Sequence, residues 1–178
     1  MEENVSIKRA LEILSINPIL TNVESIDIKE ANNRIVSQEI MALVDSPPFD
    51  NSSIDGWAIR KSDDPSRRVE TNSVFAGDKI PPSLKENEAF KIMTGAPTPP
   101  NADALVMVED GLGGEARNNF IRYQGENIEK GAIALESNSL LTPSSLALLT
   151  SIGHSTVSVF TQPSVSIIPT GDELVSPG

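Results

Sequence analysis

Residues 46–59 read SPPFDNSSIDGWAI, and this stretch decides how the chain is organised. Proline fixes φ and lacks a backbone donor, so Pro47 and Pro48 exclude a helix interior or a central strand here. Two aspartates, an asparagine and two serines follow. A calcium loop does not fit, because Ile54 stands where a ligand is required. Such polar residues bond to nearby backbone in turns, so a hydrogen-bonded turn accounts for them without a ligand.

From Asp45 to about Ser139, including this stretch, the sequence has the pattern of a small all-β unit. Short apolar runs alternate with turns rich in proline and glycine. The runs are GWAI, TNSVF, AFKIM, ALVMV and NFIRY, and the turns include GDKIPPS, TGAPTPPN and DGLGG.

The flanking sequences are mixed. An amphipathic helix is predicted over residues 5–16, where Ile7, Ala10, Leu11 and Leu14 follow a helical period, and strands are predicted in VESIDI and RIVSQEIMAL. A second helix is predicted in LTPSSLALLTSIGHS, capped by Thr142, with proline at its first position and glycine at its end. TVSVF then reads as a strand.

We therefore expect a mixed, mainly β fold of the α+β class with a discontinuous domain. Residues 1–45 and 139–163 form its two segments, and residues 46–138 form an inserted β-rich domain. Residues 164–178 begin with the buried-looking strand SVSII and pass into the loop TGDEL, as a βα unit does. We expect a truncated α/β domain to start there.

Composition limits the classes of partner. The formal net charge of −11 repels phosphate backbones, so no nucleic-acid partner is expected. The absence of cysteine excludes disulfides and thiolate metal sites. With neither a secretory signal nor a long apolar run, we expect a cytoplasmic protein without a membrane partner.

Two other stretches carry chemistry. Thr94 and Gly95 follow a predicted strand, and their backbone N–H groups could bind an anion, although taken alone the loop is better explained as a proline-rich connection between two strands. Asp172 and Glu173 also follow a predicted strand. Acids there can hold a magnesium ion beside a phosphate, or simply favour the start of a helix.

Five motifs in order resemble the molybdopterin molybdenumtransferase family, which includes bacterial MoeA and the E domain of gephyrin. They are PPFDNSSIDGWA, TGAPTPPNADALVMVE, GENI, LTPSSLALLTSIG and PSVSIIPTGDEL before SPG. The resemblance runs from about Ala10 to the last residue. It implies insertion of molybdate into adenylylated molybdopterin with release of AMP and use of Mg²⁺. It also implies a homodimer of four-domain subunits. A partner enzyme of the same pathway, which transfers the adenylyl group to molybdopterin, would supply the substrate.

The resemblance also implies site residues. Asp55, Thr94 and Glu173 match the catalytic positions, and no metal ligand is assigned. The matching substrate-binding positions are Asp50, Asn51, Ser52, Gly95, Asn127 and Asp172. In the family the active site lies where the second domain of one subunit faces the third domain of the other, so we expect residues 1–178 alone to be inactive.

This chain departs from the family pattern at Asn127, where an aspartate is usual. Asparagine brings no charge and no proton-accepting carboxylate, so that one role is in doubt. Trp57 and Ile54 also replace the commoner tyrosine and methionine. Two alternative functions remain at this point: a scaffolding module like the gephyrin domain, or a homologue that inserts tungstate.

Overall fold

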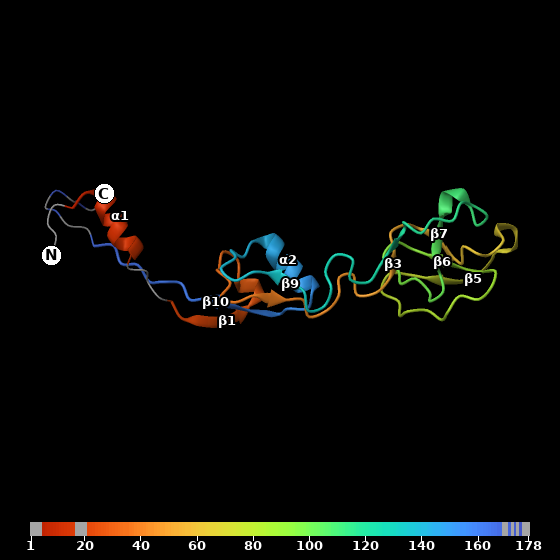
Figure 1. Ribbon diagram of the computed structural model, residues 1–178, viewed down its shortest axis with the longest axis horizontal. Helices are drawn as coiled ribbons and strands as arrows, with labels where there is room; N and C mark the ends of the chain where they lie inside the picture. The colour runs from red at the N-terminus through yellow and green to blue at the C-terminus, as the bar shows by residue number, and fades with distance from the viewer. Residues whose placement is uncertain (1–4, 17–20, 169–170, 172, 174, 176–178) are drawn as a thin grey trace.

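The computed structural model describes residues 5–16, 21–168, 171, 173 and 175. Figure 1 shows an elongated molecule in which two packed units are joined by a narrow connection, with helix α1 (Ile7–Ile16) apart from both. The described residues form two α-helices and several small sheets, which confirms the predicted mainly β fold.

The first unit is built from both flanks of the chain. Strand β1 (Val23–Asp27) pairs antiparallel with β10 (Thr156–Phe160), and β2 (Ile40–Met41) pairs with β9 (Ile133–Leu135). The 3₁₀ turn η1 (Ile28–Glu30) follows β1. Their buried side chains form one core: Ile28, Ala31, Val36, Ile40, Ala42, Leu141, Leu149, Ile152, Val157 and Val159.

Helix α2 (Pro143–Ser151) covers this core, and its ends are those predicted. The Thr142 hydroxyl accepts a hydrogen bond from the Ser145 amide at 3.3 Å, and the Ser145 hydroxyl accepts one from the Thr142 amide at 3.4 Å. This reciprocal pair satisfies donors that the first turn leaves free. Gly153, with φ of +99°, ends the helix in a conformation that favours glycine.

The second unit contains a four-stranded sheet in the order β5 (Val69–Val74), β6 (Glu88–Ile92), β4 (Gly56–Ile59) and β7 (Ala104–Met107). The β5–β6 pair is parallel and the others are antiparallel. The turn η2 (Pro65–Arg67) lies between β4 and β5, and η3 (Val108–Asp110) follows β7. Strand β3 (Asn51–Ser52) pairs separately with β8 (Ile121–Arg122).

Strand β4 is central to this sheet, and two of its residues are closely fitted. A Cβ atom on Gly56 would lie 1.9 Å from the Val106 carbonyl oxygen, so no side chain can follow Asp55 without moving β7. Next along the strand, the Trp57 indole Nε1 donates a hydrogen bond to the Glu70 carboxylate at 2.7 Å.

The structure differs from the sequence expectations at three places. Residues 164–168, predicted as a buried strand, form no strand, and Ile167 is 88% exposed, because no described strand pairs with them. The predicted strand at 34–43 is reduced to isolated bridges at Ile35 and Val36 and to β2. Helix α1 forms as expected, but its apolar stripe contributes no buried residue.

The fit of Gly56 predicts a large effect of a single methyl group. Gly56→Ala should destabilise the protein by about 1–3 kcal/mol or more, since the new Cβ meets backbone and not a movable side chain. Gly113→Ala is the matched control, because its nearest neighbour atom lies at 4.0 Å, and it should change stability by no more than about 0.5 kcal/mol. Urea unfolding of both variants measures these changes. Equal urea midpoints for Gly56→Ala and Gly113→Ala would contradict the close fit of Gly56 against β7.

Candidate functional site

Asp55 and Thr94 meet at one edge of the four-stranded sheet. Asp55 immediately precedes β4, and Thr94 lies two residues beyond the end of β6. The antiparallel register places Gly56 opposite Ile92, so the start of one strand lies beside the end of the other. The Asp55 Oδ1 atom accepts hydrogen bonds from the Thr94 amide at 2.7 Å and from the Thr94 hydroxyl at 3.0 Å.

These two bonds stabilise the ionised form of the Asp55 carboxyl. The Thr94 amide, and then its hydroxyl, lower the pKa of Asp55 below its ordinary value, because both stabilise the ionised form. Both residues are exposed. Within the described part of the chain, the second carboxylate oxygen of Asp55 has no hydrogen-bond partner. Asp55 therefore presents a fixed negative charge with one oxygen directed to solvent.

Ser52 holds the Asp55 loop against the Thr94 loop. Its amide donates to the Ala96 carbonyl at 3.0 Å, and its carbonyl accepts from the Gly95 amide at 2.8 Å. Its side chain is 1% exposed, donates to the Ile54 carbonyl at 2.6 Å and accepts from the Ile54 amide at 3.2 Å. In this chain Ser52 positions the loop from beneath the surface.

The anion-binding alternative for the Thr94–Gly95 turn is not supported by this structure, because the backbone donors of the turn are used within the protein. The Thr94 amide is bonded to Asp55, the Gly95 amide to Ser52, and the Ala96 amide to the Met93 carbonyl. Because each donor is already used within the protein, the turn has no spare N–H groups to offer an anion.

Asp50 and Asn51 belong to the same framework. The Asp50 Oδ1 atom accepts from the Gln124 amide at 2.8 Å, and its carbonyl accepts from Thr98. Asn51 is buried and donates from Nδ2 to the Phe49 carbonyl at 3.1 Å. Neither residue bonds to Asp55 directly. Their side chains bond instead to the backbone groups of Gln124 and Phe49, and so support the loop that precedes Asp55.

Asn127 lies in a second group of polar side chains. Its Oδ1 atom accepts from Arg122 Nη2 at 3.3 Å, while the Glu126 Oε1 atom accepts from Arg122 Nε at 2.8 Å. The Arg122 guanidinium, together with the Tyr123 amide, lowers the pKa of Glu126. GENI is a turn, with φ of +74° at Gly125, so both side chains can reach one guanidinium.

The sequence analysis missed Arg122. The sequence does contain a signal for an ion pair, because Arg122 and Glu126 have opposite charges and lie four residues apart. The position of this pair beside the site loop depends on the pairing of Arg122 with Asn51 in β3–β8, which the sequence does not reveal. Strand β3 thus joins the two groups, with Ser52 leading to Asp55 and Thr94 and Asn51 lying opposite Arg122. Among the residues that the structure describes, no hydrogen bond links the two groups directly.

The structure does not bring Glu173 to this site. Glu173 is exposed, and neither Asp55 nor Thr94 bonds to it. Asp172 lies outside the described residues. Among the described residues, no group of three His, Cys, Asp or Glu side chains could hold a metal ion. Asp55 alone fits Mg²⁺ only in the usual arrangement in which one carboxylate and substrate phosphates share the ion.

Two cavities bear on the position of the site. One of about 270 Å³ is lined by Phe49, Asp50, Ile80, residues 98–102 and Gln124. Another, of about 280 Å³, lies in the first unit beside His154, whose Nε2 bonds to the Met41 carbonyl at 2.8 Å. The Asp55–Thr94 pair lines neither, so it acts at an open edge of the unit.

The described helices are all too short or too polar to cross a membrane.

Comparison with known proteins identifies the family. Residues 5–153 match the model for the MoeA N-terminal region, domains I and II. The chain is 38% identical over 175 residues to molybdopterin molybdenumtransferase of Haemophilus influenzae and 32% identical over 186 residues to that of Staphylococcus aureus Mu50. These alignments cover 90% and 96% of this chain, which spans 43% of the length of each relative.

A solved structure agrees. A molybdopterin biosynthesis MoeA protein from Pyrococcus horikoshii superimposes with a TM-score of 0.75 and 30% identity, over 96% of this chain and 50% of that one. The motifs around Asp55 and Thr94, the interrupted first unit and these matches all agree, and the chain belongs to the MoeA N-terminal family, of which it contains domains I and II.

Proposed function

We propose that this chain provides the N-terminal part of an enzyme that inserts molybdate into adenylylated molybdopterin and releases AMP. The observation that carries the proposal is the Asp55–Thr94 pair in a chain of this family. The relatives named as molybdopterin molybdenumtransferases support the reaction class. We further propose that the enzyme works as a homodimer, receives its substrate from the adenylyl-transferring enzyme of the same pathway, and is cytoplasmic.

The role proposed for Asp55 follows from its charge. A carboxylate whose pKa is lowered stays ionised at neutral pH, so it cannot donate a proton there. Its free oxygen can orient a water molecule or face a cation. With substrate phosphates it would hold a Mg²⁺ ion, which neutralises negative charge that builds on the phosphates during anhydride cleavage.

Thr94 has a supporting role in this proposal. Its amide and hydroxyl both donate to the same Asp55 oxygen, which fixes the rotation of the carboxylate and leaves the other oxygen exposed. Preorganised charge of this kind favours a reaction because little reorientation is needed as charge develops. Glu173 and Asp172 are proposed to join the site from the domain that follows.

The assay that tests the function uses the full-length protein, adenylylated molybdopterin, Mg²⁺ and either molybdate or tungstate. AMP release that depends on molybdate is the expected result. Release with tungstate alone would assign the enzyme to the other oxyanion, and binding of the nucleotide without release under any condition would overturn the enzymatic proposal.

Asp55→Asn should separate catalysis from stability. The change is nearly isosteric and keeps an acceptor for Thr94, but removes the charge, so turnover should fall about 10²-fold or more while Tm changes little. Asp64→Asn is the matched control, because the exposed Asp64 carboxylate accepts the Ser66 amide at 2.9 Å and the Ser66 hydroxyl at 2.8 Å on one oxygen, beyond the opposite end of β4 from Asp55. A drop in Tm with normal turnover per folded molecule would instead assign Asp55 to the turn alone.

The pH dependence has a definite sign. The pKa of Asp55 is lowered from 3.8, so the stabilisation from Thr94 is present above that value and is lost as pH falls through the lowered pKa. A profile of kcat/KM between about pH 5 and pH 8 should therefore contain no ionisation that Asp55→Asn removes. An acidic limb that vanishes in this variant would show that substrate or metal binding raises the pKa again.

Asn127→Asp tests the departure from the family pattern. Aspartate keeps the acceptor for Arg122 and adds a charge opposite to that of the guanidinium, so the variant should fold and keep or raise activity. Glu126→Gln should lower turnover only modestly, because the Arg122 bond survives in neutral form. A large loss of AMP release in folded Asn127→Asp would show that the site requires a neutral side chain at this position.

A further inference from the structure

The two units of the molecule are joined by a ribbon of two strands, residues 42–50 outward and 122–132 returning. Figure 1 shows this ribbon between the α2–β9 region and β3. The buried core of the first unit shares no residue with the two clusters of the second. Every pair of elements in extensive contact lies within one unit. The orientation of the second unit therefore depends on the ribbon.

Backbone pairing fixes the ribbon only at intervals. The Ala42 amide donates to the Ala132 carbonyl and its carbonyl accepts from Gly131. Farther along, the Ser46 amide donates to the Ile128 carbonyl, the Ser46 carbonyl accepts from Asn127 and Ile128, and the Pro47 carbonyl accepts from Gly125. Between these two points, the Leu43 amide bonds to the Ile152 carbonyl of the first unit, and within the described part of the chain no backbone bond joins residues 43–45 to the returning segment.

Asp45 fills this interval with its side chain. Its Oδ1 atom accepts from the Lys130 amide at 2.7 Å, and its Oδ2 atom accepts from the Gln124 side-chain Nε2 at 2.6 Å. The backbone amide of Gln124 in turn donates a hydrogen bond to Asp50 Oδ1 at 2.8 Å. One carboxylate thus ties the outgoing strand to two separate points of the returning strand.

Gly125 lies beside the half-buried Asp45. A Cβ atom on Gly125 would lie 3.2 Å from Glu129 Cγ and 3.6 Å from Asp45 Oδ1, and Gly125 has φ of +74°. The Lys130 amide, and then Gln124, lower the pKa of Asp45, as expected for a carboxylate whose ionised form accepts two bonds. Asparagine could serve only one of these donors, because its amide carries a single acceptor oxygen.

We propose that Asp45 is a positioning residue: by bonding to Lys130 and Gln124 it fixes the ribbon and so the direction in which the second unit presents Asp55 and Thr94. The carboxylate touches no reacting group. It acts on the geometry of the connection, and the inference stands independently of the reaction that the site performs.

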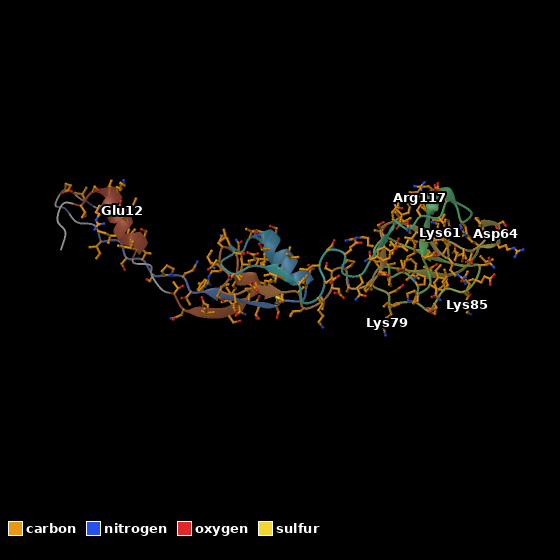
Figure 2. The ribbon with its side chains drawn as sticks, viewed as in Figure 1. Glu12, Lys61, Asp64, Lys79, Lys85 and Arg117 are labelled. Carbon is orange, nitrogen blue, oxygen red and sulfur yellow. The ribbon has the colours of Figure 1, made fainter. Side chains whose placement is uncertain are left out.

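Distances between spin labels test the proposal. Residues 1–178 contain no cysteine, so Lys79→Cys and Ser137→Cys place one label on each unit of the full-length protein once any cysteines beyond residue 178 are replaced. Figure 2 shows Lys79 at the surface of the second unit, and Ser137 is exposed in the first. The distance distribution between these labels should be narrow in the parent and broader in Asp45→Asn.

Two further variants make the result decisive. Asp103→Asn is the matched control, because Asp103 accepts the Lys61 amide at 2.6 Å within one unit, and it should leave the distribution unchanged. Gln124→Ala removes one of the two bonds and should broaden the distribution less than Asp45→Asn. It also decides the question if Asp45→Asn does not fold.

Hydrogen exchange separates a local bond from a positioning role. The Lys130 amide should exchange about tenfold faster in Asp45→Asn, as expected for the loss of one hydrogen bond to a charged group. Faster exchange together with a broader distribution supports the proposal. An unchanged distribution in folded Asp45→Asn, or in Gln124→Ala if that is the variant that folds, overturns it, whatever the exchange rate.

Discussion

The pairing of Ser52 with Gly95 and Ala96 is the interaction on which the candidate site depends. Two backbone hydrogen bonds join segments that lie more than forty residues apart in the sequence, at the point where one precedes β4 and the other follows β6. These bonds bring the two segments side by side, and so place Asp55 within hydrogen-bonding distance of Thr94. The buried hydroxyl of Ser52 bonds to both the amide and the carbonyl of Ile54. Because Ile54 immediately precedes Asp55, these bonds fix the backbone from which the Asp55 side chain projects toward Thr94.

This arrangement explains why the site is electrostatically simple. Every donor of the Thr94 turn is used inside the protein, and the result is a single ionised carboxylate at an exposed edge. Arg122 belongs to the second group of polar side chains, where Glu126 and Asn127 accept its hydrogen bonds.

Local signals in the sequence predicted the elements well and their partners poorly. Helix α2 carries its own caps in Thr142, Pro143 and Gly153, so its limits can be read directly. Residues 164–168 have the composition of a strand, but a strand needs a neighbour, and composition does not say whether one is present. The contact between Arg122 and Asn127 likewise depends on a turn, and the use of the Thr94 amide depends on strand register. Neither is encoded in a short window. The resemblance to a family placed Asp55 and Thr94 together, which spacing alone could not.

The hydrogen bond between Trp57 and Glu70 gives the molecule a built-in optical probe. Trp57 is the only tryptophan in the sequence, and it lies in β4 at the centre of the second unit, two residues from Asp55. Both described α-helices lie outside that unit, one of them on the core of the first. Indole fluorescence therefore reports on the second unit alone, whereas helical circular dichroism reports on the rest. Loss of the two signals at different denaturant concentrations would reveal that the units unfold separately, without any label.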